Sequence, residues 1–490
     1  MASLSRTSWL FVFLVFALPL VFFPYTYLAF EMPKVFLLYL FTVSTPFLLL
    51  KSGYRLGNFS KVYLLYLVFF AWIILTAALG LSFGQSFLGS YFRWQGIITW
   101  ICYFVLFFIS AKLFENPHFK KYTCYAILIA STVTALLAIT QFALYWFDGN
   151  TTQLLYNRRV ISTFGQPNFL GAYLVMSLPF TWLLLKQANL KQKGLIGLGL
   201  IIIILGILST TSRSAYLGLI FLALIWGIFH YRLLLAGIIA SIILLTILAN
   251  LFPLLVFNEW YRFKIDTTSK WTAENRLLIA QRSVQLVLQK PLTGYGLENF
   301  SLAFPAVVNS QDLGLKDIVV DSSHNLFLDL AVQLGLVGLG LFLASVSSAL
   351  ITGLKRLKSA DIESQQLIKA AICVVITFLS MHQFSVVSVV PMVLFWVSLG
   401  IITGPALAYH AISKLSRNII SLAGISSIII ISLLIIQTIR ADILFREASA
   451  YEVSDIHRSI KLDNDAIKIA PWIYFYQVRR DFLLKQLGYN

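Results

Sequence analysis

The sequence predicts an all-α protein that crosses a membrane about twelve or thirteen times, and three observations carry that prediction. Only 12% of the 490 residues are charged, whereas about a quarter are charged in water-soluble domains. Hydrophobic residues make up 59% of the chain, and the mean hydropathy is +0.83. These residues form continuous runs such as IGLGLIIIILGIL rather than alternating segments, which favours helices over a closed barrel, the other structure able to span a bilayer.

Thirteen apolar runs approach the length of about 20 residues that a helix needs to cross the hydrocarbon. In order, they cover residues 9–29, 34–50, 62–81, 96–114, 122–146, 168–185, 195–209, 214–229, 233–257, 324–351, 367–387, 391–409 and 418–438. The first run could be a signal peptide. No small-residue cleavage site follows it, so we expect it to be the first span.

Lysine and arginine in the short loops predict the orientation of these spans, because cytoplasmic loops carry an excess of both. With the N-terminus inside, the short inner loops hold 17 basic residues. The short outer loops hold five, namely Lys34, Arg93, Arg158, Arg159 and Arg213. The net charge of +17 therefore reflects topology and requires no nucleic-acid partner.

Two units follow from this topology: a transmembrane domain over residues 1–438, with a large outer loop at 258–323, and an outer helical tail over 439–490. In the tail, Ala441, Leu444, Ala448 and Tyr451 would share one face of a first helix. A second helix would begin at Pro471. The pair could start a tetratricopeptide-like array, which needs several repeats, or fold back on the large loop.

His324 ends the large loop, directly after Asp321, Ser322 and Ser323. Serine is a good N-cap, so we expect the imidazole in the first turn of the next span, where the helix dipole disfavours its protonated form. A neutral imidazole at the outer surface suits a general base. The alternative is a histidine that only caps and anchors its helix.

Two arginines of the outer side could bind an anion. Arg213 lies in the turn STTSRSAYLG, and Arg276 lies in an amphipathic helix predicted over 272–290. Guanidinium suits phosphate because it donates two parallel hydrogen bonds. The alternatives are snorkelling for Arg213 and a solvated helix face for Arg276. Arg282 is offset from Arg276 by about 120° around the helix, so both should not face one small ligand.

Three further outer segments carry candidate binding residues. In TFGQPNFLGAYL, Gln166 and Asn168 would cap a helix or bind a sugar or phosphate through their amides. In LGSYFRWQG, Arg93 lies beside aromatic residues typical of a membrane interface. Asn325 follows His324 directly and is a further candidate for substrate contact.

The sequence gives no indication of a metal or an organic cofactor. Its three cysteines, Cys102, Cys124 and Cys373, fall within predicted spans and suggest neither a disulfide framework nor a zinc site. HExxH and P-loop motifs are missing from the sequence. Asp463 and Asp465 in the tail are expected to form a solvated turn.

The chain resembles the O-antigen ligase and polymerase family of bacterial membrane glycosyltransferases over about residues 9–438. The resemblance rests on LGSYFRWQG, TFGQPNFLGAYL, the SRSAYLG turn, ENRLLIAQRSVQLVLQKPLTGYGLENF and, most specifically, DSSHNLFLDLAVQLGLVG. It implies a GT-C-like helical fold that acts on a glycan linked to undecaprenyl diphosphate, with neither metal nor cofactor. His324 matches the family's essential histidine, and Arg213 and Arg276 match its pair of diphosphate-contacting arginines.

From this resemblance we expect a transfer at the outer face of the cytoplasmic membrane. His324 would take a proton from an acceptor hydroxyl, which attacks the anomeric carbon with inversion. The arginines would hold the leaving diphosphate. The acceptor could be a glycolipid such as lipopolysaccharide, a growing polysaccharide or a protein, because the GQPN segment also resembles the protein O-oligosaccharyltransferase branch. A lipid-linked glycan flippase and a scaffold with an inert membrane part remain alternatives.

Overall fold

The computed structural model describes residues 6–51, 54–56, 61–148, 155–156, 159–230, 267–309, 312, 319–404, 407–409 and 413–488. The predicted span 233–257, residues 258–266 at the start of the large loop and Arg158 lie outside the described residues.

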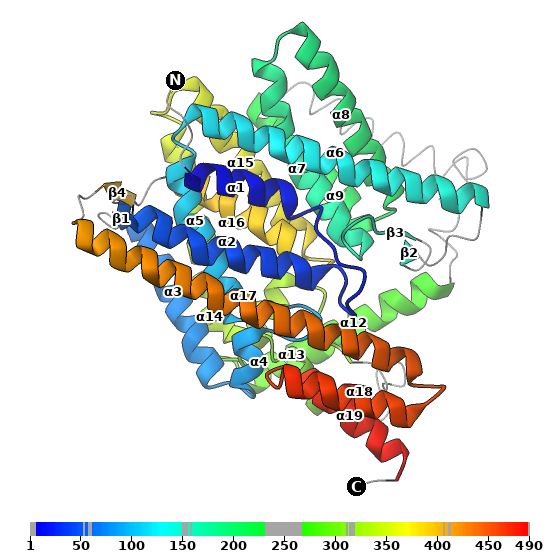
Figure 1. The fold of residues 1–490 in the computed structure, drawn as a ribbon. Helices are drawn as coiled ribbons and strands as arrows, with labels where there is room; N and C mark the ends of the chain where they lie inside the picture. Colours follow the sequence, from blue (N-terminus) through cyan, green and yellow to red (C-terminus); the bar gives the residue numbers. More distant parts are fainter. Residues whose placement is uncertain are drawn as a thin grey trace.

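The described part of the chain is a bundle of apolar helices (Figure 1). Eight of them are long and apolar enough to cross a membrane: α2 (Glu31–Lys51), α3 (Lys61–Ala78), α6 (Pro117–Asp148), α7 (Pro167–Gln187), α8 (Leu190–Ser209), α14 (Leu326–Arg356), α15 (Ile362–Met381) and α17 (Lys414–Tyr451). Four more are shorter: α1 (Arg6–Ala17), α5 (Ile97–Leu113), α9 (Arg213–His230) and α16 (Val389–Thr403). Within the described ranges, these helices match the predicted runs one by one, so the all-α polytopic fold class is confirmed.

Helix boundaries differ from the predicted runs at the N-terminus. The first run was predicted to continue to residue 29, but α1 ends at Ala17 and is followed by turns and irregular chain up to α2. Pro19 has no backbone N–H with which to continue the helical hydrogen-bond pattern. The apolar composition of residues 18–29 therefore does not translate into a longer helix.

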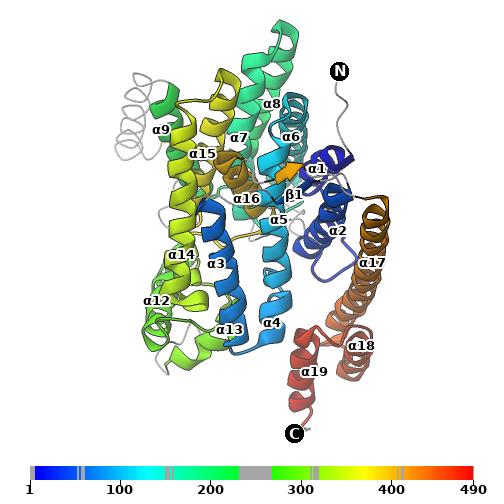
Figure 2. The same cartoon turned by 90° about the vertical axis from the view of Figure 1, so that its left-hand side faces the viewer.

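The two ends of the bundle separate the loops as the charge pattern predicts. At one end, β1 (Tyr54–Leu56) pairs antiparallel with β4 (Leu407–Tyr409). β1 belongs to a predicted inner loop, whereas β4 occupies the inner end of the predicted span 391–409, because α16 ends earlier than predicted, at Thr403. At the other end lie α4 (Phe83–Leu88), α12 (Thr267–Gln289) and α13 (Phe300–Ala303), together with the tail (Figure 2). The short helix η2 (Phe304–Val307) follows α13, and a two-stranded hairpin, β2 (Leu155–Tyr156) and β3 (Arg159–Val160), precedes α7.

The core of the bundle centres on α16, whose residues are buried from end to end. A helix that is hydrophobic all round is expected only where protein surrounds it. Trp396 of α16 contacts the rings of Tyr66, Trp100 and Phe104 from α3 and α5. On one side of this core, α17 packs along α2, which packs on α1 (Figure 1).

The tail differs from the prediction in where its helices begin. The expected first tail helix is the continuation of the last span, since α17 runs to Tyr451. The helix expected from Pro471 begins at Tyr474 as α19 (Tyr474–Gln486), and α18 (Ile456–Ile469) lies between them. Asp463 is not in a solvated turn: it is buried in α18 and forms an ion pair of 2.8 Å with Arg479.

The tail is attached to outer loops of the membrane domain through one buried carboxylate. Asp442, near the end of α17, accepts hydrogen bonds from Tyr476 Oη of α19 (3.0 Å), from Leu28 N (3.1 Å) and from Tyr91 Oη. Tyr91 also stacks on Phe475. The described contacts therefore join the tail to the first two predicted outer loops, whereas contact with the large loop was one of the two alternatives that the sequence left open.

Candidate functional site

The segment that carries His324 is held by a buried carboxylate inside the following helix. Asp329 of α14 accepts hydrogen bonds from Ser322 Oγ (2.6 Å), Ser323 N (2.7 Å) and Ser323 Oγ (2.7 Å). Ser322 and Ser323, predicted as N-caps, thus bind Asp329 instead, and Asn325 is the N-cap of α14. His324 lies before the first turn instead of within it, with a left-handed backbone (φ 59°) that non-glycine residues seldom adopt.

The first part of α14 is separated from its membrane-spanning part by a break at Gly335 (φ 71°). The turn TGYG of the large loop docks against this break. Leu336 N donates to Pro291 O at 2.7 Å, and Gly296 N donates to Gln333 O at 2.9 Å. A Cβ at position 335 would come within 2.0 Å of Leu292 O, so the close approach requires glycine here.

His324 is neutral at physiological pH, as expected, but for a different reason. Burial, and after it the positive charge of Arg276, lower the pKa of its imidazole to about 4. The dipole of α14 was the expected cause. Because the imidazole precedes the helix, we attribute the neutral state to its surroundings.

The two candidate arginines lie on the same side of the molecule as His324. Arg276 comes from α12, and Arg213 is the first residue of α9; both side chains are exposed. The pKa of Arg276 is lowered by partial burial and then by the charge of Arg213. Arg276 is thus within electrostatic range of both other groups, so three segments far apart in sequence bring one imidazole and two guanidinium groups into one region.

Arg282 is paired with a carboxylate and does not belong to this group of three side chains. Its Nε and Nη2 atoms donate to the two carboxylate oxygens of Asp312 at 2.9 and 2.8 Å. This pairing agrees with the predicted offset between Arg276 and Arg282.

The two predicted amides have different surroundings. Asn168 Oδ1 accepts from Ser212 Oγ (2.8 Å) and from Arg159 Nη2 (3.3 Å), so Asn168 braces the turn that leads into Arg213. Gln166 occupies the N-cap position of α7 without a capping hydrogen bond from its side chain. Its Oε1 is buried and has no hydrogen-bond partner among the described residues.

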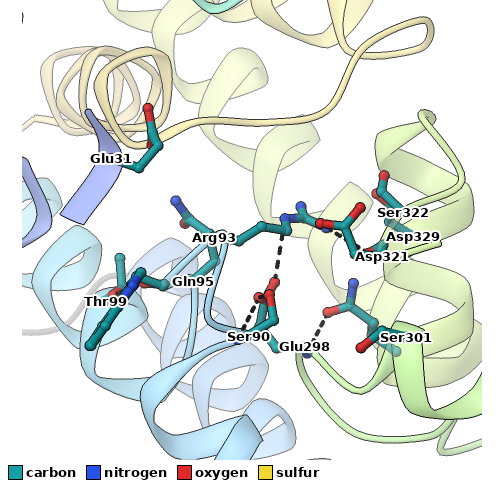
Figure 3. Close-up of polar contacts among 12 residues, drawn as sticks. Glu31, Ser90, Arg93, Gln95, Thr99, Glu298, Ser301, Asp321, Ser322 and Asp329 are labelled. Atoms are coloured by element: carbon teal, nitrogen blue, oxygen red, sulfur yellow. Dashed lines mark hydrogen bonds and ion pairs between the residues drawn. The ribbon is translucent and has the colours of Figure 1, made fainter. Parts of the chain in front are cut away.

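Arg93 supports the His324 segment from inside the protein (Figure 3). Its side chain is only 10% exposed, its Nη1 donates to Asp321 O at 3.1 Å, and its Nε lies 3.9 Å from Glu298 Oε1. Glu298 in turn accepts from Ser90 N (3.1 Å) and Ser90 Oγ (2.8 Å). The interface position suggested by the neighbouring aromatic residues is therefore wrong for this side chain.

Asn325 uses its amide within the chain. Its Oδ1 accepts from the N–H groups of Phe327 and Leu328, each at 3.0 Å, and its Nδ2 donates to Gln383 O at 3.3 Å. These bonds fix the start of α14 next to His324.

Sequence reasoning missed Asp329, Glu298 and Lys34. Lys34 was counted only as a loop cation, yet it is fully buried and donates to Thr163 O at 2.6 Å, just before Gln166. A charged residue at the end of an apolar run is costly unless it has partners. The cost of placing a charge within an apolar run could therefore have indicated from the sequence that Lys34 and Asp329 have buried partners.

The arrangement can accept a proton at the imidazole and hold an anion at the guanidinium groups. Three or more metal-ligating side chains do not cluster anywhere in the described part of the chain. The local charge of Arg213 and Arg276 is positive, which suits a phosphate-bearing ligand.

Comparisons with known proteins agree with this chemistry. Residues 198–343 match the family model described as O-antigen ligase, and this stretch contains Arg213, Arg276 and His324. The chain is 23% identical over 247 residues to a general O-oligosaccharyltransferase of Acinetobacter baylyi, covering 48% of this chain and 43% of that protein. The chain thus spans less than half the length of this relative. The resemblance to the O-antigen ligase family is confirmed over residues 198–343.

Proposed function

We propose that this chain transfers a glycan from a lipid diphosphate to an acceptor hydroxyl, and the match of residues 198–343 to the family model described as O-antigen ligase supports this proposal. The observation that supports this most directly is the convergence of His324, Arg276 and Arg213. Each comes from a different segment, and Arg276 is within electrostatic range of the other two.

In this proposal Arg213 and Arg276 bind the diphosphate of undecaprenyl diphosphate. Arg213 and Arg276 are both exposed residues, so a large lipid-linked donor can reach them. As the bond between the anomeric carbon and the phosphate oxygen breaks, negative charge grows on that oxygen. Fixed guanidinium groups stabilise this charge without reorganising, which is the largest contribution in many transfer reactions.

His324 acts as the general base. The acceptor hydroxyl gives its proton to the imidazole while its oxygen forms the bond to the anomeric carbon, and the configuration inverts. A group with a pKa of about 4 is a weak base. Diphosphate bound at Arg276 would offset part of the positive charge that lowers the pKa, so the donor itself would make His324 a better base.

The acceptor has two candidates. We favour a glycan or glycolipid hydroxyl, as in an O-antigen ligase or polymerase. The similarity to a general O-oligosaccharyltransferase supports a protein hydroxyl as the alternative. In both cases the reaction would occur at the outer face of the cytoplasmic membrane, where the charge pattern puts the loops around His324.

The test is an assay of purified protein with lipid-linked glycan and each acceptor class, in which released undecaprenyl diphosphate is measured. We expect release with one acceptor class, and loss of release in His324→Ala. His457→Ala, an exposed histidine of the tail, is the matched control and should retain the rate. If His324→Ala inserts normally and keeps the rate, the mechanism is wrong. Transport of the donor across vesicles without release would favour a flippase.

A further inference from the structure

A cavity lies at the end of the bundle opposite His324, between the beginnings of α6 and α15 and the end of α7. Its volume is about 580 Å³. Three lysines line it, Lys120 and Lys121 from α6 and Lys186 from α7, and apolar side chains that include Leu183 and Leu367 form its buried part. It thus combines positive charge with a hydrophobic floor.

The protein balances the positive charge of this cavity only in part. Lys186 Nζ donates to Gln366 Oε1 at 3.1 Å, and Lys120 Nζ lies 3.4 Å from Ser364 Oγ, so both partners are uncharged. Glu363 also lines the cavity, where it accepts from Gln187 Nε2 at 3.3 Å, and Asp361 lies within electrostatic range of Lys120. Lys369, in turn, adds a positive charge within electrostatic range of Lys186. Among the described residues, the three lysines form no ion pair with a carboxylate. An anion would supply the missing charge.

An apolar groove lies deeper along the same helix. It occupies about 240 Å³ between α6 and α8 and is lined by residues that include Leu128, Thr132 and Leu198. Leu128 follows Lys120 by two turns, about 12 Å further along α6. Gly199 keeps the groove open, because a Cβ there would lie 2.9 Å from Leu128 Cδ1. Its mostly apolar lining suits a hydrocarbon chain.

We propose that these two features form a binding site for an anionic glycerophospholipid of the inner leaflet. The lysines hold its phosphate, and one acyl chain follows the groove between α6 and α8. Basic pockets between helices on the cytoplasmic side are suited to anionic headgroups, and the charge pattern puts this end of the bundle inside. Helix α7 begins directly after Gln166, and its last residues line this cavity. The length of α7 therefore separates the cavity from the end of the bundle that carries the His324 region by about 30 Å.

Lipid selectivity of the purified protein tests this proposal without any variant. The protein is exchanged into mixed micelles with equal amounts of phosphatidylglycerol and phosphatidylcholine, and retained lipid is counted by native mass spectrometry. We expect phosphatidylglycerol to be retained at least fivefold over phosphatidylcholine, and glycerol phosphate or inorganic phosphate to compete poorly. Equal retention of both lipids would overturn the proposal. Equal competition by inorganic phosphate would also overturn it, in favour of a soluble anion.

Charge-removing variants locate the site. Lys120→Gln/Lys121→Gln/Lys186→Gln should lose the selectivity, while Lys191→Gln/Lys193→Gln should keep it. The control lysines lie at the start of α8, on the same side of the bundle but outside the cavity. Equal selectivity in both variants would refute this location. Because the site is remote from His324, glycan transfer in detergent should persist in the triple variant, so failure here and failure of the proposed function are separate outcomes.

Discussion

The His324 segment and the two arginines are held by the protein in opposite ways. His324 is fixed from three sides: Asp329 binds the serines before it, Asn325 caps the helix after it, and Arg93 donates to Asp321. Arg213 and Arg276 extend from helices with exposed side chains. The proposed proton acceptor therefore lies on a segment braced inside the protein, whereas the proposed anion clamp of Arg213 and Arg276 lies where a bulky lipid-linked donor can reach it.

If the clamp acts on the diphosphate, changing its geometry should have the largest effect. Arg276→Lys and Arg213→Lys keep the charge but lose the paired donors. We expect each to lower kcat by about 100-fold, the scale for loss of one donor to a developing negative charge. Initial rates of undecaprenyl diphosphate release measure this.

Arg282→Lys is the matched control for the clamp. It lies on the same helix as Arg276 but binds Asp312. Lysine would lose this paired contact and lower the Tm, but we expect a rate within about twofold of the original protein because the change does not touch the clamp. Original rates in both clamp variants would show that neither arginine contacts the diphosphate.

Loss of the Asp329 carboxylate, which holds the segment before His324, should lower the rate less than loss of a clamp arginine but should lower the stability more. Asp329→Asn keeps the shape but replaces charge-assisted hydrogen bonds, each of which contributes about 1.5–3 kcal/mol. We expect kcat to fall about 10-fold, equivalent to about 1.4 kcal/mol, with KM unchanged and a lower Tm. Steady-state kinetics and thermal unfolding in detergent separate the two effects. A lower Tm with unchanged kcat would make Asp329 structural only.

Asn325 distinguishes capping from substrate binding. Asn325→Asp preserves a good N-cap, and Asn325→Ala removes it at a cost of about 1 kcal/mol. Since the amide of Asn325 is engaged within the chain, we expect Asp to retain the rate and Ala to lower both Tm and, a few-fold, kcat. A large loss of transfer in Asn325→Asp at an unchanged Tm would instead identify the amide as a substrate contact.

The sequence was most informative where hydrophobicity decides the structure. The apolar runs predicted every described span in order, and the loop charges predicted which loops meet at each end. Local chemistry was harder to predict. The N-cap was assigned to serine because serine precedes the run, but Asp329, a turn further on, competes for those hydroxyls. Likewise, Glu298 is unremarkable in sequence and becomes important only because Gly335 lets the large loop dock against α14.

The smallest expected effect concerns the protonation of His324 and links the two halves of the site. Burial is the main cause of its low pKa, and the charge of Arg276 is the second. A diphosphate at Arg276 relieves only the second cause, so the pKa should rise above about 4 without returning to its ordinary value. In the free enzyme the imidazole is neutral well above a pH of about 4. We therefore expect kcat/KM to stay level from about pH 5 to 7 and to fall only at lower pH, where His324 is protonated.

NMR titration of labelled His324, with and without pyrophosphate, measures the shift of its pKa. Arg276→Gln should raise the pKa of His324 in the free enzyme and should abolish the change in this pKa on adding pyrophosphate. An identical response in Arg276→Gln would show that the clamp and the base are electrostatically independent.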